Sequence, residues 1–288
     1  KISFALSEIR YFSQGGPNIP QNWKTHYLIK EPAFWLSHKQ LEEGVITMEK
    51  SPLYTGSYCN AAKNMVQVLP NVKLVMILRN PWERAYSAFM HHCGRQRAFD
   101  RMEADGTIHP KGKVLCNADS FDQILRYFMK HIPMNRTVAS LLSDFEAADE
   151  CFQFQEYFND SSRVFPRSIY SVPLMEFLKV YDKQQLVVVT NDDLIHRPFE
   201  MMNRIQHHLK IPHFEYSKPG FTKTLKNGKT VIAHQSEGFQ TKADHSYEKM
   251  SKNARQILSE WYRADLELMK EMFPHLNSTI NRWIKDKG

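Results

Sequence analysis

Arg79 and Ser87 are the residues whose types and spacing point most directly to chemistry. They lie in the segment KLVMILRNPWERAYSAF, residues 73–89, around the expected junction of a strand and a helix. A guanidinium offers a planar fork of donors that suits a phosphate, and a hydroxyl can donate to a second phosphate oxygen. The pair therefore resembles a phosphate clamp. Alternatively, Arg79 pairs with Glu83 and Ser87 is merely a small helix residue, and the residues alone leave both interpretations open.

The elements that must position this pair follow from the local sequence. The apolar run KLVMIL, residues 73–78, predicts a short strand. Asn80 can cap a helix, and Pro81 suits the first helical position because its missing N–H costs nothing there. A helix is therefore expected over 82–92. Arg79 then stands at the carboxyl end of the strand, where ligands bind in α/β folds.

The rest of the chain repeats the order of strand, turn and helix. The run Leu186 to Val189 predicts a second central strand of a parallel sheet. We therefore expect a three-layer α/β fold, with a central parallel sheet flanked by helices, in one domain over 1–288. Further helices are expected over 60–69, in the second half of 166–181, after a cap at Asp119 or Ser120, and over 248–272.

Composition limits the classes of partner. The 288 residues are 42% hydrophobic, which supports a full core, and no apolar run approaches the roughly 20 residues that span a bilayer. The formal charge of +7, from 38 Lys and Arg against 31 Asp and Glu, favours anionic partners such as nucleotides, nucleic acid or acidic glycans. Ordinary surface lysines explain the same surplus.

Cysteines and sequons indicate a secretory compartment. The four cysteines have no C-x-x-C spacing, so a zinc site is not expected. Cys93 and Cys116 flank the polar segment 94–119, and we predict a disulfide between them because it would close a long loop. Three N-glycosylation sequons begin at Asn135, Asn159 and Asn277. The chain also opens at Lys1 directly in apolar sequence, which predicts that it is a piece of a longer protein.

Three ordered motifs resemble one enzyme family. The string ILRNPWERAYSAFMHH is similar to the 3′-phosphate-binding element of sulfotransferases that use 3′-phosphoadenosine 5′-phosphosulfate. SEIRYFS, residues 7–13, and MEKSPLYT, residues 48–55, resemble segments of the heparan sulfate branch, the glucosaminyl N-sulfotransferases and 3-O-sulfotransferases. The resemblance implies a P-loop NTPase-like sulfotransferase fold in which Arg79 and Ser87 hold the nucleotide 3′-phosphate.

The resemblance also assigns roles near the reacting atoms. It implies that Glu8 is the general base and that Lys50 lies by the transferring sulfonate and the acceptor, with Arg10 also on the acceptor side. Each residue has a simpler explanation. Glu8 could be an exposed acid or a cap near Arg10, and Lys50 could pair with Glu49 on a loop.

A late segment, GKTVIAHQSEGF at 228–239, aligns more loosely with the loop that closes over the nucleotide. The resemblance implies nucleotide contacts by Phe221, Lys229, Ser236 and Gly238. The sequence reads SEGF where relatives usually read S-K-G-R, and no cysteine brackets the loop. The family's P-K-x-G-T-T loop for the 5′-phosphosulfate has no match either, so we expect the first strand and this loop to lie upstream of Lys1.

The resulting functional hypothesis is a carbohydrate sulfotransferase. It would move a sulfonate from the nucleotide donor to a hydroxyl or amine of an acidic, glycosaminoglycan-like glycan, without a metal or a nucleic-acid partner. The expected location is the Golgi lumen, as a type II membrane protein whose anchor lies outside this chain. The alternatives are a non-catalytic glycan-binding protein of the same fold and a nucleotide kinase, although the kinase motif G-x-x-x-x-G-K-[ST] does not occur.

Overall fold

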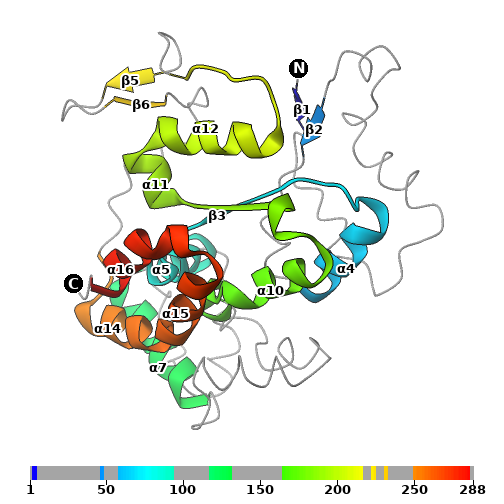
Figure 1. Ribbon diagram of the computed structural model, residues 1–288. Helices are drawn as coiled ribbons and strands as arrows, with labels where there is room; N and C mark the ends of the chain where they lie inside the picture. The colour runs from blue at the N-terminus through cyan, green and yellow to red at the C-terminus, as the bar shows by residue number, and fades with distance from the viewer. Residues whose placement is uncertain are drawn as a thin grey trace. The chain divides into compact units, whose positions relative to one another are not determined.

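A computed structural model describes residues 2–4, 46–48, 58–93, 117–131, 164–216, 222–224, 230–232 and 249–285 (Figure 1). They fall into two compact units, which are described separately. The first unit comprises Lys1–Val72 and Val172–Lys183, and the second comprises Lys73–Ser171 and Gln184–Gly288.

The first unit contains a short parallel pair and two helices. Strand β1 (Ile2–Phe4) pairs in parallel with β2 (Ile46–Met48). Helix α4 (Tyr58–Val68) confirms the helix predicted over 60–69. Most of α10 (Ser171–Val180) belongs to this unit and confirms the helix expected in the second half of 166–181.

The second unit is built around strands β3 (Leu74–Leu78) and β4 (Leu186–Thr190). They pair in parallel from Leu74 opposite Leu186 to Leu78 opposite Thr190, so both predicted strands and their direction are confirmed. All five residues of β4 are buried, as expected for an apolar strand covered on both faces. Parallel strands end at the same edge, so Arg79 lies beside the end of β4.

Helices and a hairpin complete the second unit. Before β4 come the helices α5 (Pro81–Cys93) and α7 (Ala118–His131) and the 3-10 turn η5 (Pro166–Ser168). A further 3-10 turn, η6 (Lys183–Gln185), begins in the first unit and ends in the second. After β4 come α11 (Asn191–His196), α12 (Pro198–Leu209), the antiparallel strands β5 (Thr222–Thr224) and β6 (Thr230–Ile232), α14 (Lys252–Trp261), α15 (Arg263–Met272), η7 (Pro274–Leu276) and α16 (Asn277–Lys285).

Aromatic side chains fasten the helices of this unit to one another. Tyr86 of α5 meets Phe121 of α7 edge to face at 5.0 Å between ring centroids. Phe128 of α7 stacks on Phe165 at 4.7 Å and meets Trp261 of α14 at 5.3 Å. Such pairs contribute about 0.5–1.5 kcal/mol each beyond the burial of their area. They hold α5, whose first turn follows Arg79, against the core.

The cap of α7 and the long C-terminal helix differ from the predictions. The N–H of Ser120 donates to Asn117 Oδ1 at 2.9 Å, so Asn117 caps the helix and the predicted cap at Asp119 or Ser120 is wrong. Both residues instead lie in the first turn. The helix predicted over 248–272 is two helices, α14 and α15, which meet at Tyr262, where ψ is −4° rather than the helical value of about −42°.

The described elements make an α/β protein rich in helix. The three-layer arrangement around a larger sheet, the single domain and the missing first strand with its loop stay predictions. Among the helices that the structure describes, none is both long and apolar enough to cross a membrane.

Candidate functional site: the end of strand β3

The junction between β3 and α5 is built as the sequence predicts. Asn80 is buried, and its Oδ1 accepts a hydrogen bond from Glu83 N–H at 3.3 Å. Its carbonyl accepts the first helical bond, from Arg84 N–H at 2.9 Å. Pro81 is the first residue of α5. Asn80 is therefore the N-cap, and the chain turns directly from strand to helix after Arg79.

Arg79 is partly paired and partly accessible. Its Nε lies 3.6 Å from Glu83 Oε2, and the two side chains are 43% and 41% exposed. The alternative pairing with Glu83 therefore exists, but an exposed ion pair of this kind contributes only about 0–1 kcal/mol. Nε is itself buried without a hydrogen bond. The exposed area of the side chain therefore lies on its other atoms.

Ser87 lies on the same side of α5 as Glu83. The two residues are four apart, which places them one above the other on a helix, about 6 Å apart along its axis. Ser87 is half-buried. Arg79, Glu83 and Ser87 thus form one row with the carboxylate in the middle. An anion that contacts both Arg79 and Ser87 would replace Glu83 as the partner of the guanidinium.

Arg84, the next cation, has a structural role. Its Nε donates to Ser168 Oγ and its Nη2 donates to the carbonyl of Val164, both at 2.7 Å. These bonds fasten α5 to η5. The Arg84 guanidinium is therefore bound to protein partners, so of the two described arginines at this junction Arg79 is the one that can contact a ligand.

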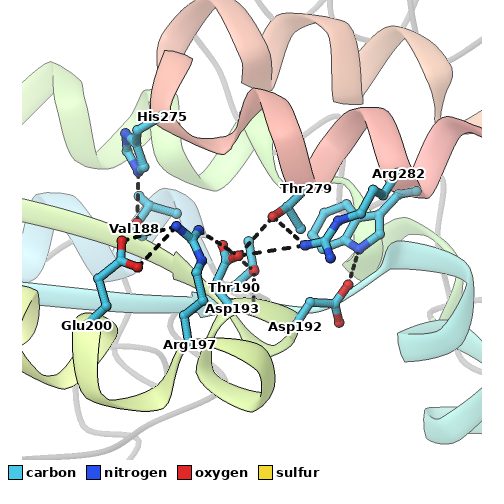
Figure 2. Close-up of polar contacts among 10 residues, drawn as sticks. Val188, Thr190, Asp192, Asp193, Arg197, Glu200, His275, Thr279 and Arg282 are labelled. Atoms are coloured by element: carbon cyan, nitrogen blue, oxygen red, sulfur yellow. Dashed lines mark hydrogen bonds and ion pairs between the residues drawn. The ribbon is translucent and has the colours of Figure 1, made fainter.

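The neighbouring strand end, after β4, carries a carboxylate that is already neutralised (Figure 2). Asp193 is 3% exposed. Its Oδ1 accepts hydrogen bonds from Arg197 Nη2 at 2.9 Å and from Thr279 Oγ1 at 3.0 Å, and Arg282 Nη2 lies 3.7 Å away. Burial raises the pKa of Asp193, but the hydrogen bonds from Arg197, Thr190 and Thr279 outweigh it and hold the pKa below its usual value.

Further contacts in Figure 2 attach α16 and η7 to the same strand end. Trp283 Nε1 donates to Asp192 Oδ2 at 2.5 Å, and His275 Nε2 lies 3.0 Å from the carbonyl of Val188. We call Asp192, Asp193, Arg197, Thr279, Arg282 and Trp283 the β4-end network. It closes this strand end by protein contacts, in contrast to the accessible Arg79 at the end of β3.

Sequence reasoning missed the β4-end network, although part of it carries a local signal. The segment TNDD has the Thr-x-x-acid spacing of a helix start, and Asp193 N–H donates to Thr190 Oγ1 at 3.0 Å. The partners on α16 give no such signal, since Thr279 is 86 residues from Asp193.

The other predicted site residues lie outside the described part of the chain. Arg79 lies at the end of β3 and Ser87 lies in α5, and their joint role as a phosphate clamp stays a prediction. The roles of the remaining residues stay predictions, namely Glu8, Arg10, Lys50, Phe221, Lys229, Ser236 and Gly238. All four cysteine side chains, and so the Cys93–Cys116 disulfide, also lie outside it. Among the described residues, no three His, Cys, Asp or Glu side chains are grouped as metal ligands would be.

The partly exposed Arg79 thus stands at the carboxyl end of a parallel strand, which is where ligands bind in α/β folds. The chain belongs to the sulfotransferase domain family, whose sequence profile matches residues 27–288. This confirms the family predicted from the three motifs.

Curated relatives are similar in sequence to this chain over most of its length. A bifunctional heparan sulfate N-deacetylase/N-sulfotransferase 1 of Caenorhabditis briggsae is 24% identical over 288 residues, which cover 94% of this chain and 29% of the relative. The Drosophila melanogaster bifunctional heparan sulfate N-deacetylase/N-sulfotransferase is 25% identical, covering 86% and 20%, and Homo sapiens N-deacetylase/N-sulfotransferase 1 is 23% identical, covering 83% and 23%. The chain thus spans a fifth to under a third of these relatives.

A solved structure supports the fold. The crystal structure of a sulfotransferase from Alicyclobacillus acidocaldarius matches with a TM-score of 0.53 at 14% identity, covering 94% of this chain and 85% of that one. At this identity the match supports the fold class and carries no further functional detail.

Proposed function

We propose that this chain transfers a sulfonate from 3′-phosphoadenosine 5′-phosphosulfate to a hydroxyl or amine of a glycosaminoglycan-like glycan. The observation that supports it best is the placement of Arg79 and Ser87 around the β3–α5 junction, with a buried Nε that lacks a hydrogen bond. The matching family profile makes sulfotransfer the expected reaction. The relatives are named for heparan sulfate, so a polyanionic glycan is the expected acceptor.

In this proposal Arg79 and Ser87 bind the 3′-phosphate through hydrogen bonds and so fix the position of the nucleotide. The guanidinium provides two parallel N–H donors and the hydroxyl a third, while Glu83 turns away. The donor supplies an activated sulfonate, and catalysis depends mainly on positioning and charge stabilisation.

Two residues outside the described part are assigned to the reaction itself. Glu8 accepts the proton of the acceptor hydroxyl or amine, for which it must come within about 3 Å. Lys50 neutralises negative charge that develops on the oxygens around the sulfonate. Arg10 lies on the acceptor side, while Phe221, Lys229, Ser236 and Gly238 contact the nucleotide. No metal is needed, and the surplus of +7 guides both anions.

The proposal includes a cellular setting and a fold. The relatives are named for heparan sulfate, so we infer an enzyme of the Golgi lumen, attached to the membrane only through a segment outside this chain. We also infer the three-layer sheet and a 5′-phosphosulfate loop upstream of the described strands.

Transfer of a labelled sulfonate to de-N-sulfated heparan sulfate tests the reaction, with Glu8→Gln as the variant and Glu267→Gln as its control. Glu8→Gln keeps the size of the side chain but removes the base, so turnover should fall about 10²- to 10⁴-fold. Donor affinity should stay the same because Glu8 serves the acceptor. Glu267 lies on α15, where it pairs with Lys270, so its variant should keep full turnover.

Near-normal turnover of folded Glu8→Gln would contradict the role of Glu8. Absence of any transfer by a wild-type protein that carries the 5′-phosphosulfate loop, together with intact glycan binding, would instead favour the non-catalytic alternative.

A further inference from the structure

The main-chain carbonyl of Arg79 is held by a side chain from a distant segment. Tyr170 Oη donates a hydrogen bond to this carbonyl at 2.7 Å, across 91 residues of sequence. Strand β3 has ended at Leu78, and Glu83 N–H, which a helical bond would direct to residue 79, donates to Asn80 Oδ1 instead. Within the described segments, the carbonyl therefore has neither a strand nor a helix partner. Main-chain carbonyls in part-buried positions need one, and Tyr170 supplies it.

Tyr170 is in turn fixed by a buried carboxylate on α15. Asp265 is 0% exposed. Its Oδ2 accepts the N–H of Tyr170 at 3.0 Å, and its Oδ1 accepts the N–H and the Oγ–H of Ser171 at 2.8 and 2.5 Å. Burial raises the pKa of the Tyr170 hydroxyl to about 12, so it remains a donor at every working pH.

We propose that Tyr170, anchored by Asp265, is a positioning residue that aims Arg79 at the nucleotide 3′-phosphate. The hydrogen bond to the carbonyl fixes the plane of the Arg79–Asn80 peptide, and with it the direction in which the Arg79 side chain leaves the backbone. Preorganised donors bind an anion without the entropic cost of being ordered at that moment. This inference rests on the proposed function, in which Arg79 holds the nucleotide.

Tyr170→Phe and Tyr262→Phe make a matched pair for the test. Tyr262 is also buried, and its Oη donates to a main-chain carbonyl, that of Phe165, at the same 2.7 Å. Each variant removes one buried hydroxyl from one carbonyl, and Tyr262→Phe also removes a contact with the Ser168 side chain, so Tyr262→Phe should lose at least as much stability. The carbonyl of Phe165 does not carry the phosphate ligand. Only Tyr170→Phe should therefore weaken the binding of adenosine 3′,5′-bisphosphate, by about 3- to 10-fold, the effect of one hydrogen bond.

Arg79→Ala, alone and combined with Tyr170→Phe, tests whether Tyr170 affects nucleotide binding through Arg79. If Tyr170 acts through Arg79, adding Tyr170→Phe to Arg79→Ala should cause no further loss of affinity. Equal affinities in Tyr170→Phe and Tyr262→Phe, with weak binding in Arg79→Ala, would overturn the positioning role alone. Unchanged affinity in Arg79→Ala would overturn the phosphate clamp itself, and the positioning role with it.

Asp265→Asn tests whether the anchoring of Tyr170 by Asp265 also matters for nucleotide binding. The amide nitrogen cannot accept the N–H of Tyr170, so the anchor is loosened while the Tyr170 hydroxyl is retained. We expect affinity for adenosine 3′,5′-bisphosphate to fall about 2- to 5-fold, as for a partly lost hydrogen bond. Wild-type affinity in folded Asp265→Asn would overturn the anchoring role of Asp265.

Discussion

Arg79 combines a fixed main chain with an accessible side chain. Asn80 and Tyr170 hold the backbone on either side of the Arg79–Asn80 peptide. Among the described residues, the Arg79 guanidinium is paired with a half-exposed carboxylate, that of Glu83, at 3.6 Å. The described residue that limits anion binding here is therefore Glu83, because its charge competes for the same cation.

Glu83→Gln should strengthen nucleotide binding. The change removes a negative charge that lies between Arg79 and Ser87 but keeps the length of the side chain. Repulsion between exposed like charges about 6 Å apart is about 1 kcal/mol or less, so affinity for adenosine 3′,5′-bisphosphate should rise about 2- to 5-fold in calorimetry. Glu267→Gln, which removes the same charge from α15, should leave affinity unchanged. Equal or weaker binding in Glu83→Gln would show that the carboxylate does not compete with the ligand.

Among the elements, those marked by local chemistry were predictable and those fixed by distant contacts were not. The apolar runs gave β3 and β4, and Asn80 with Pro81 gave the start of α5. The cap of α7 was assigned wrongly because Asn117 lies within three residues of two other good cap residues. The β4-end network depends on α16, whose pairing with α11 no local pattern encodes.

The candidate site likewise contains residues that a local motif indicates and residues that only distant contacts position. Arg79 and Ser87 could be proposed as a pair from the sequence because Ser87 follows Arg79 by eight residues across one strand-to-helix junction. Tyr170 and Asp265 could not, since they are 95 residues apart in the sequence and neither belongs to a readable motif. A buried carboxylate whose partners are main-chain N–H groups leaves almost no trace in a single sequence.

The end of α12 offers a prediction at the scale of one element. Lys210 has φ 54° and ψ 34°, the left-handed conformation that favours glycine. Its N–H donates to the carbonyl of His207 at 3.1 Å, and Ile211 N–H donates to that of Gln206 at 3.2 Å, as in a Schellman motif. Lys210→Gly should therefore stabilise the protein by about 0.5–1 kcal/mol, since it removes the crowded Cβ.

Urea denaturation of Lys210→Gly and Lys210→Ala measures this gain. Alanine also removes the long side chain but keeps the Cβ, so it should give no increase in stability. A similar gain in both variants would attribute the effect to the lost lysine charge rather than to the backbone.

At the scale of the whole molecule, two buried carboxylates respond to pH in opposite directions. Burial raises the pKa of Asp265 to about 6, against 3.8 ordinarily, despite the hydrogen bonds from Ser171 and Tyr170. Its contribution to stability is fully present below about pH 4 and is lost as the pH rises through 6. The pKa of Asp193 is lowered, so its contribution is present above about pH 4 and is lost as the pH falls through the native value.

Between about pH 4 and 6 the Asp193 contribution is present and the Asp265 contribution is only partly lost, so these two groups together stabilise the fold more near pH 5 than at pH 8. The raised pKa of Asp265 corresponds to a loss on the order of 3 kcal/mol across its whole titration, of which roughly half falls between pH 5 and pH 8. Thermal unfolding at pH 5 and pH 8 measures the difference in wild type and in Asp265→Asn, which cannot ionise. The variant should lose much less stability between the two values. Identical pH profiles would contradict the assignment of this titration to Asp265.

The most direct test of the sulfotransferase account is whether Arg79 reads the 3′-phosphate of the nucleotide. Calorimetry should compare adenosine 3′,5′-bisphosphate with adenosine 5′-phosphate on wild type, Arg79→Ala, Ser87→Ala and, as a control, Arg263→Ala, which removes an exposed cation from the start of α15.

Wild type and Arg263→Ala should prefer the bisphosphate at least about 30-fold, since a charge-assisted contact is worth about 2 kcal/mol or more. Arg79→Ala should lose most of this preference, and Ser87→Ala should lose less of it. A wild-type protein that binds both nucleotides equally, or an Arg79→Ala protein that keeps the full preference, would contradict the account.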